Sequence, residues 1–157
     1  MKSKIYITGA AGFIGFHTAK KFLDKGIKVH GFDSINNYYD VNLKKSRLNI
    51  LNKYKNFSFT KGLLENYKLL NKSVLKFKPI IMIHLAAQAG VRYSIDNPDV
   101  YLNSNIMGTF NVIKIANKIK VKHLIIGSSS SVYGANKKIP FQEIDKTDHQ
   151  VSFYAAT

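Results

Sequence analysis

Apolar and polar residues alternate along this chain in two kinds of pattern. Short runs rich in β-branched residues are separated by longer segments in which apolar residues recur every three or four positions. Short apolar runs indicate strands, and the wider spacing indicates amphipathic helices. The pattern predicts five strands, at residues 4–8, 27–32, 57–60, 80–85 and 121–126.

The longer segments predict helices between these strands. Their expected ranges are residues 13–24, 41–54, 63–77 and 97–118, with a further helix beginning at Ser152. In the second helix we expect Leu43, Leu48 and Leu51 to face the core. The apolar positions of the long fourth helix are Val100, Ile106, Phe110, Val112, Ile113 and Ala116.

Strands that alternate with helices are typical of an α/β protein whose parallel sheet carries helices on both faces. The chain has 157 residues and shows neither an internal repeat nor a low-complexity linker. A chain of this length is long enough for one domain with a buried core. We therefore expect a single doubly wound parallel sheet.

The composition adds a strong positive charge to this picture. There are 24 Lys and Arg residues against 9 Asp and Glu residues, for a formal net charge of +15. Arg47 and Arg92 are the only arginines, and the lysines are spread over the whole chain. Proteins that bind nucleic acid rely on arginine for bidentate contacts and gather their charge in patches. We therefore expect no nucleic-acid partner.

Other residue types exclude further classes of protein. The sequence has no cysteine, so it predicts neither disulfide bonds nor a thiolate metal site. It has no uninterrupted apolar run of the roughly 18 residues that a membrane helix needs. His17, His84 and His149 lie apart, without a second ligand at metal-binding spacing. We expect a cytoplasmic protein with no membrane partner and no metal.

The first candidate site follows the first strand. Gly9, Gly12 and Gly15 lie between that strand and the first helix. Glycine allows a sharp turn at Gly9, a close approach of a pyrophosphate at Gly12, and close packing of the helix on the sheet at Gly15. Glycines also gather in ordinary turns, so the spacing is informative only because it joins a strand to a helix. In that position it predicts a dinucleotide site.

Asp33 supports the dinucleotide site. It ends the second strand, about 20 residues beyond the last glycine. An acidic residue at this place accepts hydrogen bonds from the ribose hydroxyls of adenosine and repels a 2′-phosphate. Asp33 therefore favours NAD over NADP, although a polar residue that merely ends a strand would occupy the same position.

Two further segments extend the candidate site. Small residues follow the fourth strand, at 86–90, and hydroxyl-bearing residues follow the fifth, at 127–134. The carboxyl ends of parallel strands lie at one edge of the sheet, where open α/β sheets bind ligands. Ser129 and Tyr154 can meet over one substrate at this edge.

Together these motifs resemble the extended short-chain dehydrogenase/reductase family. The matching pieces are residues 8–15, Asp33, residues 84–87, Asn105 with Gly108 and Thr109, residues 128–134, and Tyr154. Within the family the sequence is most similar to nucleotide-sugar epimerases that act on UDP-glucuronate. That similarity rests on residues 37–40, Leu43 with Arg47 and Leu48, residues 86–94, Asn97 with Pro98, and residues 152–157.

The resemblance implies a Rossmann fold and a 4-epimerase that uses bound NAD transiently. Tyr154 matches the tyrosine that takes the proton from the sugar 4-hydroxyl as hydride moves from C4 to the nicotinamide. Ser129 matches the hydroxyl that hydrogen-bonds the 4-oxygen. The other implied contacts with the UDP-sugar are Gln88, Arg92, Ser130 and Ser131. The implied cofactor contacts are Gly9, Gly12, Phe13, Ile14, Gly15, Asp33, Asn36, Leu64, Leu85, Ala86 and Ala87.

The sequence departs from the family pattern at its C-terminal end. In the family, a lysine four residues after the catalytic tyrosine helps to lower a pKa that is ordinarily near 10. The resemblance implies that Thr157 is one residue short of that lysine, and we expect the half of the family's chain that holds the UDP-sugar to lie outside these 157 residues. We therefore expect residues 1–157 to be an incomplete NAD-binding Rossmann domain, truncated before the substrate domain and inactive alone. We also expect an uncovered sheet edge, an exposed apolar face, and a homodimer at full length.

Leu63 is a second departure. The family usually has an aspartate at this position, which accepts a hydrogen bond from the adenine amino group. Loss of one such hydrogen bond costs roughly 0.5 to 1.5 kcal/mol. Leu64 still offers its backbone to the adenine ring.

Other functions fit parts of the same pattern. UDP-galactose 4-epimerases and dTDP-glucose 4,6-dehydratases belong to the same family, although dehydratases tend to carry Asp-Glu where this chain has Ser130 and Ser131. A non-catalytic NAD-binding module would share the glycine turn and Asp33 without using Tyr154.

Overall fold

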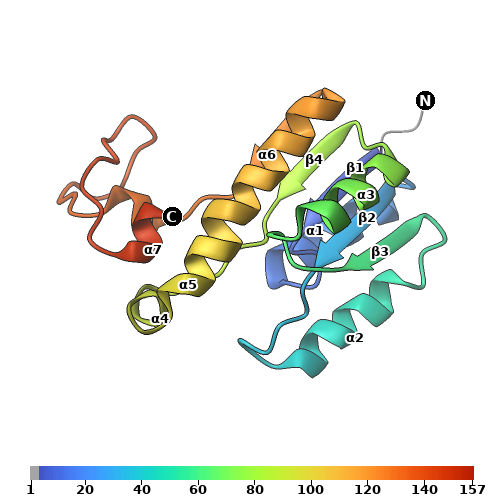
Figure 1. Cartoon of the computed structure of the whole chain (residues 1–157), viewed down its shortest axis with the longest axis horizontal. Coiled ribbons are helices and arrows are strands. Elements are labelled where there is room, and N and C mark those ends of the chain that lie inside the picture. Colours follow the sequence, from blue (N-terminus) through green and yellow to red (C-terminus); the bar gives the residue numbers. More distant parts are fainter. Residues whose placement is uncertain (1–3) are drawn as a thin grey trace.

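A five-stranded parallel sheet forms the centre of the computed structural model, which describes residues 4–157 (Figure 1). The strand order is β3-β2-β1-β4-β5, and all four pairings are parallel. The strands are β1 (Lys4–Thr8), β2 (Lys28–Asp33), β3 (Phe57–Lys61), β4 (Ile81–His84) and β5 (His123–Ile126). The order reverses between β1 and β4, which is where open sheets of this kind bind ligands. The predicted doubly wound parallel sheet is confirmed.

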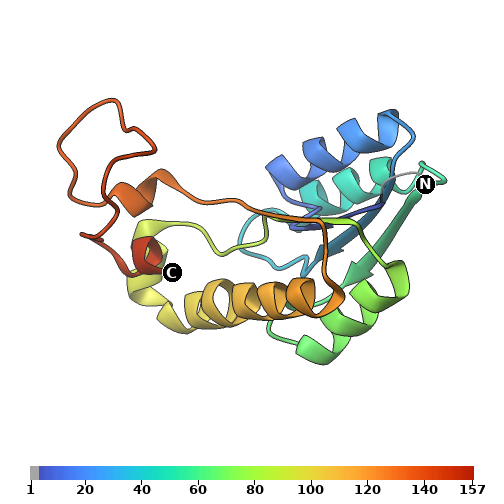
Figure 2. The same ribbon diagram turned by 90° about the horizontal axis from the view of Figure 1, so that it is seen from above.

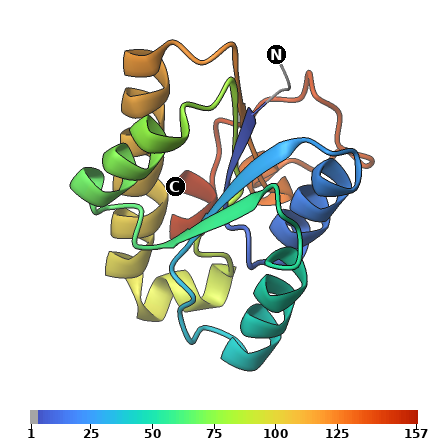
Figure 3. The same cartoon turned by 90° about the vertical axis from the view of Figure 1, so that its right-hand side faces the viewer.

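Helices cover both faces of the sheet (Figures 2 and 3). One face carries α1 (Phe13–Asp24) and α2 (Val41–Leu51), and the other carries α3 (Tyr67–Phe77) and α6 (Gly108–Ile119). The remaining elements are α4 (Val91–Asp96), α5 (Pro98–Tyr101), the π-helical η1 (Leu102–Met107), the short 3₁₀ helix η2 (Ser130–Tyr133) and α7 (Phe153–Ala156). None of the helices in residues 4–157 has both the length and the apolar character needed to cross a membrane.

The alternation of side chains along the strands builds two cores. Ile5, Ile7 and Val29 face α1 and α2, whereas Tyr6 and Phe32 face α3 and α6. Successive side chains of a strand point to opposite faces, so each central strand supplies both cores. Burying one such side chain fully stabilises the fold by about 1.5 to 3 kcal/mol.

Three predicted helices have different boundaries in the structure, and the one expected at residues 41–54 ends at Leu51. The helix expected from residue 63 begins at Tyr67, because the side chain of Asn66 caps it by accepting a hydrogen bond from Leu69 N at 3.1 Å. The segment before Asn66 is left free to line the site. The single helix expected at residues 97–118 is divided into α5, η1 and α6, and it is preceded by α4, which the pattern did not predict.

The second helix buries a lysine in place of a leucine. Leu43 is 45% exposed, against expectation, whereas Lys44 is only 5% exposed. Lys44 is buried because its ammonium group donates hydrogen bonds to Asn36 in the preceding loop. Leu48 and Leu51 are buried as predicted.

The long helical segment exposes several positions that were expected to be apolar and inward. Val112 and Ala116 are buried, but Ile106, Phe110 and Ile113 are each more exposed than a core residue. Phe110 and Ile113 lie three residues apart on α6, on a different side of the helix from the buried Val112 and Ala116. An apolar stripe therefore remains on the outer side of this segment.

Strand β5 is an edge of the sheet within residues 4–157. Ile125 and Ile126 are each 44% exposed. The expected uncovered edge and exposed apolar face are therefore present in this part of the chain. Beyond β5 the C-terminal segment extends away from the sheet toward α4, where α7 packs (Figure 1).

Candidate functional site

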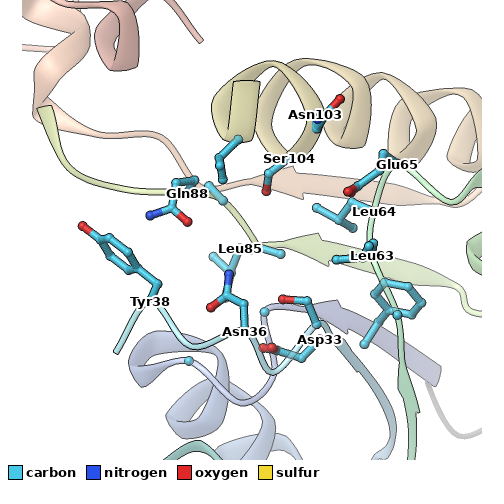
Figure 4. A pocket seen from close by; sticks show the side chains of 18 of the residues that line it. Asp33, Asn36, Tyr38, Leu63, Leu64, Glu65, Leu85, Gln88, Asn103 and Ser104 are labelled. Carbon is cyan, nitrogen blue, oxygen red and sulfur yellow. The ribbon is translucent and has the colours of Figure 1, made fainter. Parts of the chain in front are cut away.

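A cleft opens at the carboxyl ends of the strands, around the point where the strand order reverses. We call it the central cleft; its lining includes Gly9, Gly12, Asp33, Asn36, Tyr38, Lys44, Leu63, Leu64, Glu65, residues 85–88, Asn103 and Ser104. Figure 4 shows Asp33 and Asn36 on one side, Asn103 and Ser104 on the other, and Leu85 between them. Five segments of the chain thus converge on one cavity, within residues 9–12, 32–44, 62–65, 85–88 and 100–104.

The glycine turn fits against the end of β4 without room for side chains. Gly9 has a φ of +71°, and a Cβ there would lie 2.8 Å from Ala86 N. A Cβ on Gly15 would lie 2.0 Å from the carbonyl oxygen of Gly9. Gly15 therefore allows the turn to close on itself, rather than allowing α1 to approach the sheet as expected. Gly12 caps α1 and lines the cleft, so the positive end of the helix faces the cavity.

Asp33 connects the second strand to the glycine turn. Its Oδ2 accepts a hydrogen bond from Ala11 N at 3.0 Å, and its Oδ1 accepts one from Ile35 N at 2.9 Å. The side chain is buried yet lines the central cleft. The carboxylate is therefore held in one orientation before any ligand arrives, and its remaining lone pairs can accept hydrogen bonds from hydroxyl groups.

Leu63 and Leu64 form an apolar part of the cleft wall, which is held by a residue that the sequence pattern did not single out. Leu64 is buried, and Leu63 beside it is half exposed. The buried Asn111 on α6 donates from Nδ2 to the carbonyl oxygens of Leu64 at 3.0 Å and Glu65 at 3.3 Å. The sequence did contain a signal for this role, because Asn111 is a polar residue on the inner face of the helix predicted at residues 97–118.

A hydroxyl and an imidazole hold the end of β4 in place. Oγ1 of Thr8 accepts hydrogen bonds from Leu85 N and Ala86 N, both at 3.1 Å. With both lone pairs occupied, the Thr8 hydroxyl donates its hydrogen to Nδ1 of His84, 2.7 Å away. The Nε2–H of His84 then donates to Oγ1 of Thr109 at 3.0 Å. His84 is therefore a neutral, buried link, and its burial lowers its pKa to about 4.

A second cavity, the outer cleft, adjoins the central cleft and shares Leu85, Ala86 and Ala87 with it. Its lining also includes Ile14, Ser128, Ser129, Ser131, Val132 and Tyr154. The structure thus brings Ser129 and Tyr154 to one cavity. Ser129 Oγ accepts a hydrogen bond from Ser131 N at 3.2 Å, and Tyr154 N donates to Ser94 Oγ at 3.2 Å.

Asn105 ties the outer cleft to the end of β4. Its Oδ1 accepts from Gln88 N at 2.7 Å, while its Nδ2 donates to Gln88 O at 3.0 Å and to Thr157 Oγ1 at 3.1 Å. Asn105 lies in the π-helical η1, whose altered register turns it inward. This buried amide supports the backbone of the site.

Most of the predicted site residues line one of the two clefts. The central cleft takes Gly9, Gly12, Asp33, Asn36, Leu64 and Gln88, the outer cleft takes Ile14, Ser129, Ser131 and Tyr154, and both share Leu85, Ala86 and Ala87. Within residues 4–157, four predicted residues lie outside both linings: Phe13, Gly15, Arg92 and Ser130. Sequence reasoning missed Tyr38, Lys44, Asn103, Ser104 and Asn111, which line or support the central cleft.

Residues 6–157 match the protein family described as GDP-mannose 4,6 dehydratase. The chain belongs to this family. The resemblance to extended short-chain dehydrogenases/reductases is confirmed by this match, which spans nearly all of the chain.

Members of the family with other names are similar to this chain. It is 48% identical to a protein of Rhizobium meliloti (strain 1021) named "Probable UDP-glucuronate 4-epimerase". The matched region of 151 residues covers 96% of this chain and 44% of that protein. The structure of the UDP-glucose 4-epimerase from Bifidobacterium longum in complex with NAD⁺ and UDP matches with a TM-score of 0.85 and 28% identity, over 98% of this chain and 45% of that one. The UDP-Glc/GlcNAc 4-epimerase from Campylobacter jejuni matches with a TM-score of 0.88 and 25% identity, again over 98% and 45%. The chain therefore spans less than half the length of these relatives.

Proposed function

We propose that this chain is the NAD-binding part of a nucleotide-sugar 4-epimerase. The observation that carries the proposal is the pair of adjoining clefts. The central cleft has the glycine turn and Asp33, and it meets the outer cleft, with Ser129 and Tyr154, along residues 85–87. A dinucleotide that extends through the first cavity would place its nicotinamide end beside the second.

The residues of the central cleft fit NAD. Gly12 leaves room at the N-terminus of α1 for a diphosphate, and the fixed carboxylate of Asp33 suits two ribose hydroxyls. The same carboxylate would repel the 2′-phosphate of NADP. Solved neighbours of this fold, such as the Bifidobacterium longum epimerase, hold NAD⁺.

The residues of the outer cleft fit an acid–base role at the sugar. NAD held in the central cleft by the glycine turn and Asp33 would supply the hydride acceptor and donor for C4 of the sugar. The phenolate oxygen of Tyr154 would take the proton of the 4-hydroxyl, becoming a phenol, and would later return that proton. Ser129 would hold the 4-oxygen with its hydroxyl, which now donates to Ser131 Oγ at 3.3 Å and can rotate toward a ligand.

UDP-glucuronate is the substrate that we propose, with UDP-galacturonate as the product. Support comes from the Rhizobium meliloti relative and from the sequence segments shared with such enzymes. UDP-galactose 4-epimerases and dTDP-glucose 4,6-dehydratases remain the alternatives. Because the chain covers 44% of that relative, we assign turnover to a longer protein and expect the 157 residues alone to be inactive.

We further propose that the longer protein is a homodimer. Leu102, Ile106, Phe110 and Ile113 form an apolar stripe along η1 and α6, and they are 44%, 46%, 58% and 45% exposed. A contiguous apolar stripe on a helix is the kind of surface that a second copy covers in a two-fold interface.

Calorimetric titration of the purified 157-residue chain with NAD and NADP tests the cofactor assignment. We expect NAD to bind and NADP to bind at least about tenfold more weakly, because of charge repulsion at Asp33. Absence of NAD binding at millimolar concentration would overturn the proposal. Conversion of UDP-glucuronate by these residues alone, followed by NMR, would contradict the assignment of turnover to a longer protein.

A further inference from the structure

Lys44 is a buried lysine in the wall of the central cleft. Its side chain is 5% exposed, whereas Lys45, the next residue of α2, is exposed. Its Nζ donates to Asn36 O at 2.8 Å and to Asn36 Oδ1 at 2.6 Å, and it lies 4.1 Å from the centre of the Tyr39 ring. The group is thus held firmly at a defined place in the cavity wall.

This ammonium group has no carboxylate partner in the part of the chain that the structure describes. No ion pair within 4.0 Å joins Lys44 to an aspartate or glutamate among residues 4–157. Burial lowers the pKa of Lys44, the nearby charge of Asp33 raises it, and Arg47 lowers it. A charge that is taken out of water without a close counter-ion is costly. The cleft therefore contains a cation that an anionic ligand would stabilise.

Lys44 also determines which way the Asn36 amide faces. An ammonium group has only donors, so the side-chain atom of Asn36 beside it must be the oxygen. The amide nitrogen of Asn36 consequently points away from Lys44, and Figure 4 shows it directed toward the middle of the cleft near Leu85. Two of the three N–H groups of Lys44 bond to Asn36, which leaves one for a ligand.

Three features that favour an anion therefore line one cavity: the N-terminus of α1 at Gly12, the Asn36 amide nitrogen and the Lys44 ammonium. We propose that Lys44 binds the diphosphate of the dinucleotide and is its principal positive counter-charge. The inference rests on the proposed function, because it takes the central cleft to be the NAD site. It adds a residue whose charge acts on the phosphates, separate from Asp33, which acts on the ribose.

ADP and adenosine distinguish a charge effect from a structural one, because only ADP carries the diphosphate. We would titrate both into the 157-residue chain and into its Lys44→Met, Lys44→Gln and Lys45→Met variants. Met keeps the length and apolar stem of the lysine, and Gln keeps an N–H that can bond to Asn36. Lys45→Met removes the same charge from an exposed site on the same helix and is the matched control.

We expect both Lys44 variants to bind ADP about tenfold to a hundredfold more weakly and adenosine within twofold of the unchanged chain. Lys45→Met should bind both within twofold. Thermal unfolding of each variant shows whether the fold is retained. If Lys44→Met does not fold, the ADP and adenosine affinities of Lys44→Gln test the proposal.

Two results would overturn the inference while leaving NAD binding intact. One is unchanged ADP affinity in the folded Lys44 variants, and the other is an equal loss of ADP and adenosine affinity, which would make Lys44 only a brace for Asn36. If the unchanged chain binds neither ADP nor NAD, the proposed function itself fails, and the inference fails with it.

Discussion

The Thr8 hydroxyl lies 2.7 Å from Nδ1 of His84, and this hydrogen bond joins the ends of β1 and β4 beneath both clefts. The same hydroxyl accepts from Leu85 N and Ala86 N. One oxygen atom therefore holds the glycine-turn strand, the imidazole and the shared wall of the clefts.

Replacement of Thr8 by valine should destabilise the protein. Valine has nearly the same shape but leaves two backbone N–H groups and Nδ1 of His84 without their buried partner. We expect the free energy of unfolding in urea to fall by about 2 to 4 kcal/mol. Thr147→Val, at an exposed position, should change it by less than about 0.5 kcal/mol. Equal effects of the two substitutions would contradict the role of Thr8.

Stability should decrease as the pH falls from about 6.5 to about 4. Burial lowers the pKa of His30 and His84 to about 4 each, and the charge of Lys76 adds to the effect at His30. Because the unfolded chain takes up these protons at higher pH than the folded chain, the stabilisation is complete above pH 6.5 and is lost toward pH 4. Each histidine contributes about 3 kcal/mol at most.

Urea midpoints measured across this pH range test the histidine prediction. His30→Gln should make the loss of stability with falling pH shallower, since one buried titrating group is removed. His17→Gln, which replaces a histidine on the exposed side of α1, is the control. A pH profile that His30→Gln does not alter would show that other groups cause the decline.

A methyl group at Gly15 should disrupt the cofactor turn. Its Cβ would lie 2.0 Å from Gly9 O, so the turn has to move, and we expect NAD affinity to fall more than about tenfold. Gly26 is the control, because a Cβ there meets nothing within 4 Å, although its φ is +73°. Gly26→Ala should cost about 1 kcal/mol of stability and leave NAD affinity unchanged. Normal NAD binding by Gly15→Ala would refute this account of the turn.

A charge in the apolar stripe should prevent self-association. Phe110 is 58% exposed at the middle of the stripe, and Phe110→Asp would require desolvation of a carboxylate in the interface. If the proposed dimer forms, sedimentation should show that Phe110→Asp is a monomer. The dissociation constant of the dimer should change by less than twofold in Ile144→Asp. Ile144 is 86% exposed and lies outside the stripe. A dimer that tolerates Phe110→Asp would place the interface elsewhere.

The sheet and the glycine turn were predictable because their signals are local. Each strand is a short apolar run, and the parallel arrangement of the strands follows from their alternation with helices. Gly9, Gly12 and Asp33 lie close together in the central cleft because two neighbouring strand ends carry them. Ser129 and Tyr154 share the outer cleft because η2 and α7 pack against each other.

The remaining features depend on contacts that periodicity does not encode. Leu43 was expected to be buried and is exposed, whereas Lys44 beside it is buried and donates a hydrogen bond to Asn36. The π-helical turn divides the long helix and contains the buried Asn105, and a local change of the helical hydrogen-bond register leaves no signal in an apolar pattern. Side chains placed by such contacts, including Lys44 and Asn111, are therefore visible only in three dimensions.

The backbone of residues 85–87 is the common boundary of the two clefts, and this has a thermodynamic consequence. A ligand that orders this boundary from one side lowers the entropy cost of binding on the other side, so the two occupants stabilise each other. Coupling of this kind is reciprocal: a sugar nucleotide that fits the outer cleft would raise the affinity for the dinucleotide by the same factor by which the dinucleotide raises the affinity for the sugar nucleotide.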